Sequence, residues 1–288
     1  MTLVLGTVQF GLPYGIANQN GQVSLDDAKK IIALARLSGI DTLDTAIAYG
    51  NSEASLGHIG VNGFKVITKL PILPENVSNV GLWVHNQIRE SLQKLNVESV
   101  YAVLIHHSQQ LLGPKGKDLY QSLEHLKTKG LVKKVGISIY DPIELDSVMN
   151  AFTIDLVQAP FNLIDQRLNS SGWLQKLYDQ GVEVHARSVF LQGLLLKKYQ
   201  LPKKLNKINK KICEFHNWAK INKVKPINAA LNFVLQHKQI DKVILGVDNC
   251  DQLLEIINNL DTNTLQIPKK FSINEEKLIN PSLWPTKK

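Results

Sequence analysis

The segment Tyr101-Ala102-Val103-Leu104-Ile105-His106 carries four consecutive apolar residues between a tyrosine and a histidine. A strand with one face in water would alternate apolar and polar side chains, whereas an unbroken apolar run is expected when both faces are buried. Strands buried on both faces occur in parallel sheets that are covered by helices. The segment therefore predicts an α/β protein built on a parallel sheet.

Similar strand-like segments recur on both sides, and with this one they number eight. They are Leu3–Val8, Thr42–Asp44, Lys65–Lys69, Tyr101–Ile105, Lys134–Ser138, Leu156–Ala159, Glu183–Arg187 and Lys242–Leu245. Helical patterns lie between them; the helix expected after Ser24 carries Asp26 and Asp27 at the positive end of its dipole and ends at Gly39. Eight alternating strands and helices predict a single (β/α)8 TIM barrel.

A doubly wound open sheet is the alternative to a closed barrel. That fold would carry a G-x-G-x-x-G turn after its first strand, and Gly6-Thr7-Val8-Gln9-Phe10-Gly11 does not have that spacing. No linker or internal repeat divides the sequence, so we expect residues 1–288 to form one domain. Residues 268–288 are expected to be a polar C-terminal tail that packs across one face of the barrel or frays.

Composition narrows the class of protein. Apolar residues make up 44% of the chain, yet no apolar run approaches the roughly 20 residues of a membrane-spanning helix. No signal-peptide pattern precedes the first strand. The two cysteines, Cys213 and Cys250, lack the spacing typical of a disulfide framework or a zinc site. We therefore expect a cytoplasmic enzyme that holds no metal.

The net charge of +8 is concentrated in one segment. Residues 197–225 hold ten lysines and one glutamate, a local charge of +9, so the rest of the chain carries −1. Apolar residues recur there at helical spacing, at Leu205, Ile208, Ile212, Phe215 and Ala219. This pattern favours a helix whose lysines face water, with attraction of an anionic substrate or a membrane surface as the alternative. Nucleic-acid binding is not expected, because no base-reading motif accompanies the charge.

Polar residues follow three consecutive predicted strands. In a (β/α)8 barrel, catalytic groups lie at the carboxyl ends of the strands and in the loops beyond. Asp44 ends the second strand, Tyr49 lies in the following loop, Lys69 ends the third strand and His106 follows the fourth. We expect the Lys69 ammonium, held by Asp44, to lower the pKa of Tyr49 from about 10 so that its hydroxyl can protonate a carbonyl undergoing reduction. A neutral His106 would orient the carbonyl oxygen.

Each of these residues has an ordinary structural explanation when taken alone. A strand-end aspartate often caps a turn, and a single tyrosine or lysine usually packs or is solvated. Their joint occurrence at one end of the barrel is what favours a catalytic group. Phe10 and His107 are expected beside the substrate pocket, and for His107 a purely structural role is an equally good interpretation.

Three segments resemble motifs of the aldo-keto reductases. Leu43-Asp44-Thr45-Ala46-Ile47-Ala48-Tyr49-Gly50 resembles the D-T-A-x-x-Y-G signature, and Val66-Ile67-Thr68-Lys69 is similar to the segment with that family's catalytic lysine. Tyr101–His106 resembles the strand that delivers its histidine, and the similarity extends through Val243-Ile244-Leu245-Gly246. The resemblance implies a barrel enzyme that reduces an aldehyde or ketone with a nicotinamide cofactor, with Tyr49 as proton donor.

The same resemblance assigns residues to the cofactor. It implies that Ser138 and Gln158 bind the nicotinamide amide, and that Arg187 stands where the family often has a stacking aromatic residue. It further assigns the pyrophosphate to Ser188, Gln192 and Gly193, and the adenosine end to Gly246, Asp248, Gln252 and Glu255.

The sequence also departs from the family's pattern. Ile139 and Ile256 occupy positions where the family usually has asparagine. NADP(H) is the family's default cofactor. The lack of basic residues near Asp248 leaves NAD(H) as the alternative, because a 2′-phosphate favours cationic partners.

Two other functions fit the same barrel. Lys69 could form a Schiff base in an aldolase, and the chain could be a cofactor-binding barrel without catalysis, since a fold alone does not fix a function. The expected partner is a small-molecule carbonyl substrate. The segment from Ala186 to Gly193 resembles bacterial members linked to sugar metabolism. We expect a monomer or a weak homo-oligomer; the sequence identifies neither the substrate nor the direction of the reaction.

Overall fold

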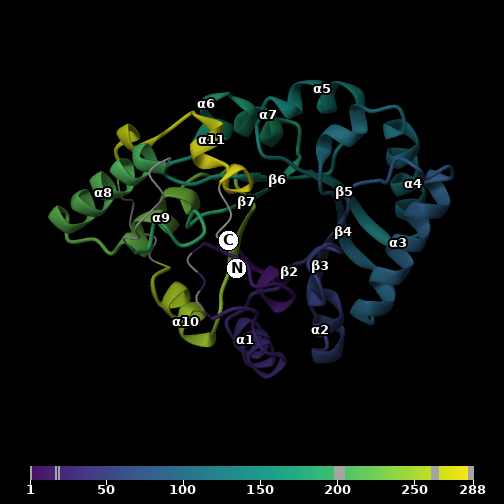
Figure 1. Cartoon of the computed structure of the whole chain (residues 1–288), viewed down its shortest axis with the longest axis horizontal. Helices are drawn as coiled ribbons and strands as arrows, with labels where there is room; N and C mark the ends of the chain where they lie inside the picture. The colour runs from purple at the N-terminus through teal and green to yellow at the C-terminus, as the bar shows by residue number, and fades with distance from the viewer. Residues whose placement is uncertain (1, 17, 19, 198–204, 261–265, 285–288) are drawn as a thin grey trace.

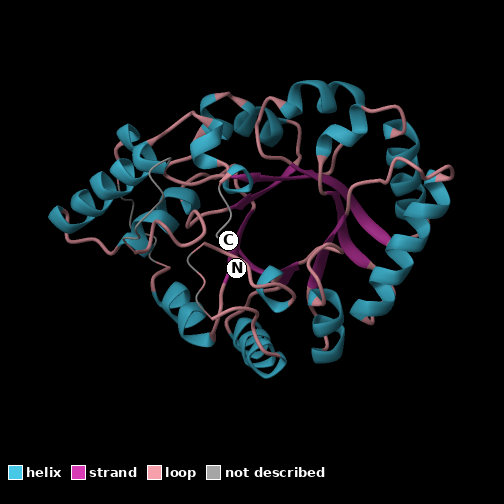
Figure 2. Ribbon diagram, viewed as in Figure 1, coloured by secondary structure: helices cyan, strands magenta, loops and turns pink. Residues whose placement is uncertain are grey.

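The fold is a closed ring of eight parallel strands surrounded by helices (Figures 1 and 2). A computed structural model of the chain describes residues 2–16, 18, 20–197, 205–260 and 266–284. The strands follow one another in chain order around the ring, and the last pairs with the first. They are β1 Leu3–Gly6, β2 Thr42–Asp44, β3 Lys65–Leu70, β4 Val100–Ile105, β5 Val132–Ser138, β6 Leu156–Pro160, β7 Glu183–Arg187 and β8 Lys242–Gly246.

Helices occupy every connection between consecutive strands. The α-helices are α1 Leu25–Leu37, α2 Ser52–Ile59, α3 Val80–Leu95, α4 Gly116–Thr128, α5 Glu144–Ala151, α6 Arg167–Ser170, α7 Trp173–Asp179, α8 Asn206–Ile221, α9 Pro226–Leu235, α10 Cys250–Asn258 and α11 Glu276–Ile279. Short 3-10 helices are η1 Val8–Phe10, η2 Ser108–Leu112, η4 Lys269–Phe271 and η5 Pro281–Leu283. Two connections carry a helix pair, α6 with α7 and α8 with α9.

The predicted barrel is confirmed, and the alternative of an open sheet is wrong. All eight predicted strands are present, with ends that differ by at most two residues. The largest error at a carboxyl end is in β1, which we expected to reach Val8. The chain turns away at Thr7, because both its backbone N–H and its hydroxyl donate to the carbonyl of Asp44, at 2.9 and 3.0 Å. Val8 therefore begins the helix η1 instead of continuing the strand.

The helix-end signals in the sequence act as expected. The Ser24 hydroxyl accepts a hydrogen bond from the backbone N–H of Asp27 and caps α1. Gly39, just past the end of α1, has a φ of +75°, a conformation that glycine adopts without steric cost. Pro226 is the first residue of α9, where its missing N–H removes no helical hydrogen bond.

The core lies in two layers. Four buried side chains on the strands, Ile67, Ala102, Leu104 and Leu156, fill the inside of the ring. A larger cluster lies between the ring and the helices. Residues Ala102 to Ile105 are all fully buried, as their unbroken apolar run predicts.

The lysine-rich segment forms α8, which lies at the outer left edge in Figure 1. All five apolar residues that predicted this helix are buried, which confirms the expected amphipathic helix. Three of the lysines of the segment, Lys198, Lys203 and Lys204, fall outside the described residues. The C-terminal segment packs against the barrel as far as Trp284, with Phe271 fully buried; residues 285–288 are outside the described part. Within the described ranges, no helix is long and apolar enough to cross a membrane.

A single glycine inside the barrel provides a test of this packing. A Cβ atom on Gly136 of β5 would lie 2.4 Å from the Leu156 carbonyl oxygen and 2.6 Å from Leu104 Cδ2. We expect Gly136→Ala to lower the free energy of unfolding by about 1–3 kcal/mol, because the neighbouring backbone must move. Gly81→Ala in α3 is the control, since its Cβ would meet only ordinary contacts; it should be neutral or slightly stabilising. Urea unfolding of both variants checks this, and equal stabilities would contradict it.

Candidate active site

A buried ion pair lies at the carboxyl end of the barrel. Lys69 Nζ donates to both carboxylate oxygens of Asp44, at 2.8 and 2.7 Å, and to the carbonyl of Thr45 at 2.8 Å. Lys69 is fully buried and Asp44 is 4% exposed. Gln158 also donates to Asp44, at 2.8 Å, from β6 on the opposite side of the ring. These contacts satisfy all three N–H donors of the ammonium.

Tyr49 and His106 lie directly beside this pair. The Tyr49 ring lies against Lys69, with Nζ 5.0 Å from the ring centroid. His106 meets Tyr49 edge to face, with centroids 5.8 Å apart, and the exposed His107 follows at 5.5 Å. The structure therefore brings together the four residues that the sequence analysis selected for catalysis, and His107 lies next to them as expected.

The loop that carries Tyr49 packs against the loop that follows β1. A Cβ on Gly11 would fall 1.8 Å from the Tyr49 carbonyl oxygen, so glycine is required for the two backbones to approach this closely. The Ser52 hydroxyl, at the start of α2, contacts Thr7 Oγ1 at 2.9 Å and Thr45 Oγ1 at 3.1 Å. These buried contacts fix the position from which Tyr49 extends toward the barrel mouth.

The electrostatics of the site differ from the expectation in one respect. Burial, reinforced by the charge of Asp44, raises the pKa of Tyr49 above its ordinary value. The expectation that Lys69 lowers the pKa of Tyr49 is therefore wrong, because burial dominates and the Asp44 carboxylate adds to the rise. Burial also lowers the pKa of Lys69, against the opposing effect of Asp44.

His106 is neutral at physiological pH, as expected. Burial, the Lys69 ammonium and His107 lower the pKa of His106 to about 3, with a smaller contribution from Arg187. A neutral imidazole can still donate or accept a hydrogen bond at the mouth.

Arg187 and Tyr140 form a second feature of the mouth. The Arg187 guanidinium lies over the Tyr140 ring, with Cζ 4.3 Å from the centroid. One of its N–H groups donates to the Ile139 carbonyl at 2.8 Å, and another approaches Ser188 Oγ at 3.3 Å. At position 139, where the family usually has asparagine, the backbone carbonyl of Ile139 accepts this hydrogen bond from Arg187.

The remaining residues assigned to the cofactor lie in three places. Ser138 is buried at the end of β5, beside Gln158 on β6. Gln192 accepts a hydrogen bond from the backbone of Ile16 at 3.0 Å and contacts the Tyr14 hydroxyl at 3.3 Å, so it links the loops after β7 and β1. Ser188 and Gly193 belong to the same β7 loop as Gln192 and, like it, have positive φ.

Two of the four residues assigned to the adenosine end, Asp248 and Gln252, contact each other. Gln252 accepts from the backbone N–H of Asp248 at 2.8 Å and its amide lies 3.4 Å from the Asp248 carboxylate. Gly246 approaches Gln9 so closely that a Cβ would lie 2.5 Å from its amide nitrogen. Glu255 is exposed on α10, whereas Ile256 is buried.

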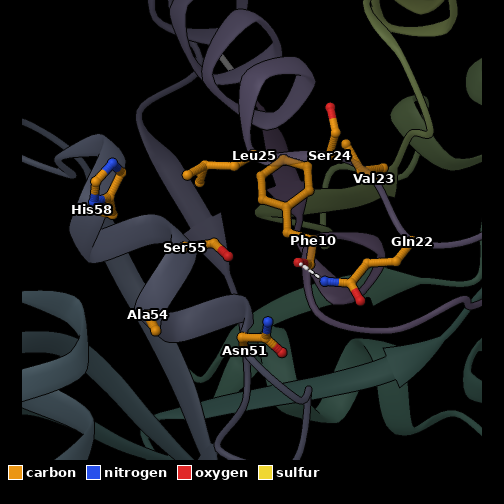
Figure 3. Close-up of a pocket in the computed structure, with 9 residues that line it drawn as sticks. All are labelled: Phe10, Gln22, Val23, Ser24, Leu25, Asn51, Ala54, Ser55 and His58. Atoms are coloured by element: carbon orange, nitrogen blue, oxygen red, sulfur yellow. Dashed lines mark hydrogen bonds between the residues drawn. The ribbon is translucent and has the colours of Figure 1, made fainter.

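Phe10 does not line the barrel mouth. Its side chain is buried and lines a separate cavity of about 550 Å³ outside the barrel, between the start of α1 and α2. Figure 3 shows the ring directed toward Ser24 and Leu25, with Asn51 and His58 on the other wall. The assignment of Phe10 to the substrate pocket is therefore not supported by its position, because η1 turns the side chain outward.

Sequence reasoning missed Tyr140, Gly11 and Arg167. Tyr140 lies two residues beyond the end of β5, and this place just past a strand end was the available signal. Arg167 donates to Asp165 through two nitrogens, at 2.9 Å each, and to the Tyr140 carbonyl at 2.9 Å. Nothing in the local sequence around Gly11 indicates its contact with Tyr49, because the two positions are distant in the chain.

The ion pair predicts non-additive effects on stability. We expect Asp44→Asn and Lys69→Met each to lower the free energy of unfolding by about 3–5 kcal/mol, because each leaves a buried charge without its partner. The double variant leaves no uncompensated charge and should lose much less than the sum of the two. Urea unfolding of the four proteins measures this coupling, and strictly additive losses would contradict it.

The lowered pKa of His106 predicts a pH dependence of stability. Below about pH 6.5 the unfolded chain binds a proton at His106 that the folded chain does not bind until about pH 3, so stability falls as the pH drops through this window. Between pH 7 and 5 the wild type should lose about 1 kcal/mol more than His106→Gln, allowing for partial exposure. The exposed His125→Gln variant is the control; if it behaves like His106→Gln in urea unfolding, the assignment is wrong.

Comparison with known proteins shows that the chain is similar to oxidoreductases. The chain is 27% identical over 173 residues to the uncharacterized oxidoreductase YtbE of Bacillus subtilis (strain 168), covering 57% of this chain. It is 23% identical over 206 residues to L-glyceraldehyde 3-phosphate reductase of Escherichia coli (strain K12), covering 62% of this chain. The chain spans 59% of the length of each of these curated relatives.

A solved structure shares the fold over most of both chains. The holo form of aldo-keto reductase AKR11C1 from Bacillus halodurans matches with a TM-score of 0.75 at 18% identity, covering 92% of this chain and 88% of that one. A sequence model of the aldo/keto reductase family matches residues 2–273, nearly the whole chain. The chain therefore belongs to the aldo/keto reductase family.

Proposed function

We propose that the chain is an NAD(P)H-dependent carbonyl reductase in which Tyr49 is the proton donor. The observation that carries the proposal is the Asp44–Lys69 pair lying against the Tyr49 ring with neutral His106 beside it. Membership in the aldo/keto reductase family supports an oxidoreductase acting on carbonyl groups. One curated relative is named for reduction of a phosphorylated aldehyde, which makes a small aldehyde the substrate class to test first.

The mouth of the barrel has polar side chains that fit a nicotinamide nucleotide. The hydroxyl of Ser138 is buried next to Gln158 and suits an amide group. In the β7 loop, Ser188, Leu191, Gln192 and Gly193 all have φ between +48° and +87°. The N–H groups of Leu191 and Gly193 donate to carbonyls within this loop, at 2.9 Å each, so the side chains of Ser188 and Gln192 are the donors we assign to the pyrophosphate. When bound, the reduced nicotinamide supplies a hydride to the carbonyl carbon.

The chain's own residues then handle the carbonyl oxygen. His106 orients the oxygen by a hydrogen bond, and Tyr49 gives its proton to that oxygen as negative charge develops there. The raised pKa of Tyr49 keeps it protonated and ready to donate, and an alkoxide is basic enough to accept the proton. The Asp44–Lys69 pair packs against the Tyr49 ring and holds it in place for this transfer, and Tyr49 then recovers its proton from solvent.

The choice between NADP(H) and NAD(H) depends on the adenosine end. The family default is NADP(H), whereas the carboxylate of Asp248, which pairs with Gln252, disfavours a 2′-phosphate.

Use of Lys69 as a Schiff-base nucleophile is disfavoured, because its three N–H donors are engaged by Asp44 and Thr45. If the chain were a cofactor-binding barrel without catalysis, it would bind NADPH or NADH tightly and reduce no aldehyde.

The proposal is tested in two stages. Fluorescence titration with NADPH and NADH should give saturable binding of at least one, and failure of both would sink the proposal. Tyr49→Phe should then lower kcat/KM for aldehydes by about 100-fold or more with an unchanged cofactor Kd, because only the proton is removed. The exposed Tyr178→Phe on α7 is the matched control and should behave as the wild type. Full activity of Tyr49→Phe would exclude Tyr49 as the donor.

A further inference from the structure

The cations at the barrel mouth are not equivalent. Lys69 is paired with Asp44, and Arg167 is paired with Asp165 and Asp141. Among the residues that the structure describes, no carboxylate lies within ion-pair distance of Arg187, whose described contacts are a carbonyl, a hydroxyl and a ring. Cations that are partly buried in proteins are usually paired with an acid or a ligand.

Arg187 is held in a fixed orientation. The Tyr140 ring covers one face of the guanidinium, and Tyr140 is itself fixed through its backbone. The backbone N–H of Tyr140 donates to Glu144 Oε1 at 2.8 Å, and the backbone carbonyl of Tyr140 accepts from Arg167 at 2.9 Å. The contacts with Ile139 and Ser188 use two of the five N–H donors of a guanidinium. The other three are available to an oxyanion.

Arg187 also faces the reacting groups. Side chains alternate along β7, so Glu183, His185 and Arg187 share one face of the strand. His185 on that face is fully buried, and Arg187 at the strand's end is half-buried at the mouth. The charge of Arg187 contributes to lowering the pKa of His106 and opposes the rise in the pKa of Tyr49, which is consistent with this position.

We propose that Arg187 binds an oxyanion on the carbonyl substrate, a carboxylate or a phosphate, and that Tyr140 is the positioning residue that holds the guanidinium for it. The inference rests on the proposed carbonyl reduction and adds a substrate class to it, namely aldehydes or ketones that carry a second, anionic group. A guanidinium donates to such groups through parallel N–H bonds in its own plane. Stacking on Tyr140 leaves that edge open.

The test compares charged and neutral forms of one substrate. We would measure kcat/KM for 4-oxobutanoate against its methyl ester, and for glyceraldehyde 3-phosphate against glyceraldehyde, which separates a carboxylate site from a phosphate site. The wild type should prefer at least one anionic form by about 10- to 100-fold. Arg187→Gln should remove most of that preference, which is measured as the ratio of kcat/KM for the anionic form to kcat/KM for the neutral form, so that an equal loss on both forms does not change it. Arg187→Lys should retain part of it.

Two further variants separate the proposed roles. Tyr140→Phe keeps the ring and should keep the preference, whereas Tyr140→Leu should reduce it, mainly through KM for the anionic substrate. Lys133→Gln is the control, because it removes one exposed positive charge from the opposite end of the barrel, near Tyr101; its preference should match the wild type.

The outcomes are distinguishable from those of the proposed function. If no aldehyde is reduced, the proposed function fails. If neutral aldehydes are reduced but the wild type shows no preference for an anion, or Arg187→Gln keeps the preference, this inference is overturned. A loss of NADPH affinity in Arg187→Gln with the preference unchanged would likewise overturn it and assign Arg187 to the cofactor.

Discussion

The buried Asp44–Lys69 pair constrains the rest of the site. A lysine without solvent contact is stable as an ammonium only if each of its three N–H donors has an acceptor, and here two carboxylate oxygens and the Thr45 carbonyl fill that requirement. These acceptors must hold their positions to within a few tenths of an ångström, which a flexible surface loop does not provide. The pair therefore depends on β2 and β3 being neighbours in the ring, and on Gln158 reaching Asp44 from the opposite strand. Tyr49 and His106 lie against a group that the barrel itself makes rigid.

Much of this arrangement could be predicted from the sequence, because it depends on local signals. The unbroken apolar run before His106 identifies a strand buried on both faces, and polar residues at consecutive strand ends must meet at one mouth. The roles of Tyr140 and Gly11 could not be predicted in this way. Each depends on a contact between segments far apart in the chain, with Arg187 in one case and the Tyr49 carbonyl in the other. The expected place of Phe10 beside the substrate pocket is not supported for a related reason. Two hydrogen bonds from Thr7 turn the chain before Phe10, and no residue in the segment indicates that turn.

The error in the pKa of Tyr49 has a physical explanation. Sequence reasoning paired an ammonium with a phenol and expected attraction to dominate. In the structure the ammonium has its own carboxylate, so Tyr49 experiences a nearly neutral pair together with the loss of water on burial. Among the described residues, Arg187 is the cation at the mouth that has no ion-pair partner, and sequence comparison treats it mainly as an unusual replacement. Charge at a site is thus set by which cations have partners, which a sequence pattern does not reveal.

The close approach of Gly11 to Tyr49 couples two positions that are 38 residues apart. Any side chain at position 11 would displace the backbone that carries the tyrosine, although it would never touch a substrate. The geometry therefore links the two positions as a pair: the backbone path at position 49 is compatible only with a residue at position 11 that has no side chain. A homologue with a Cβ atom at position 11 must carry residue 49 on a different backbone path, whatever its other residues at the mouth are.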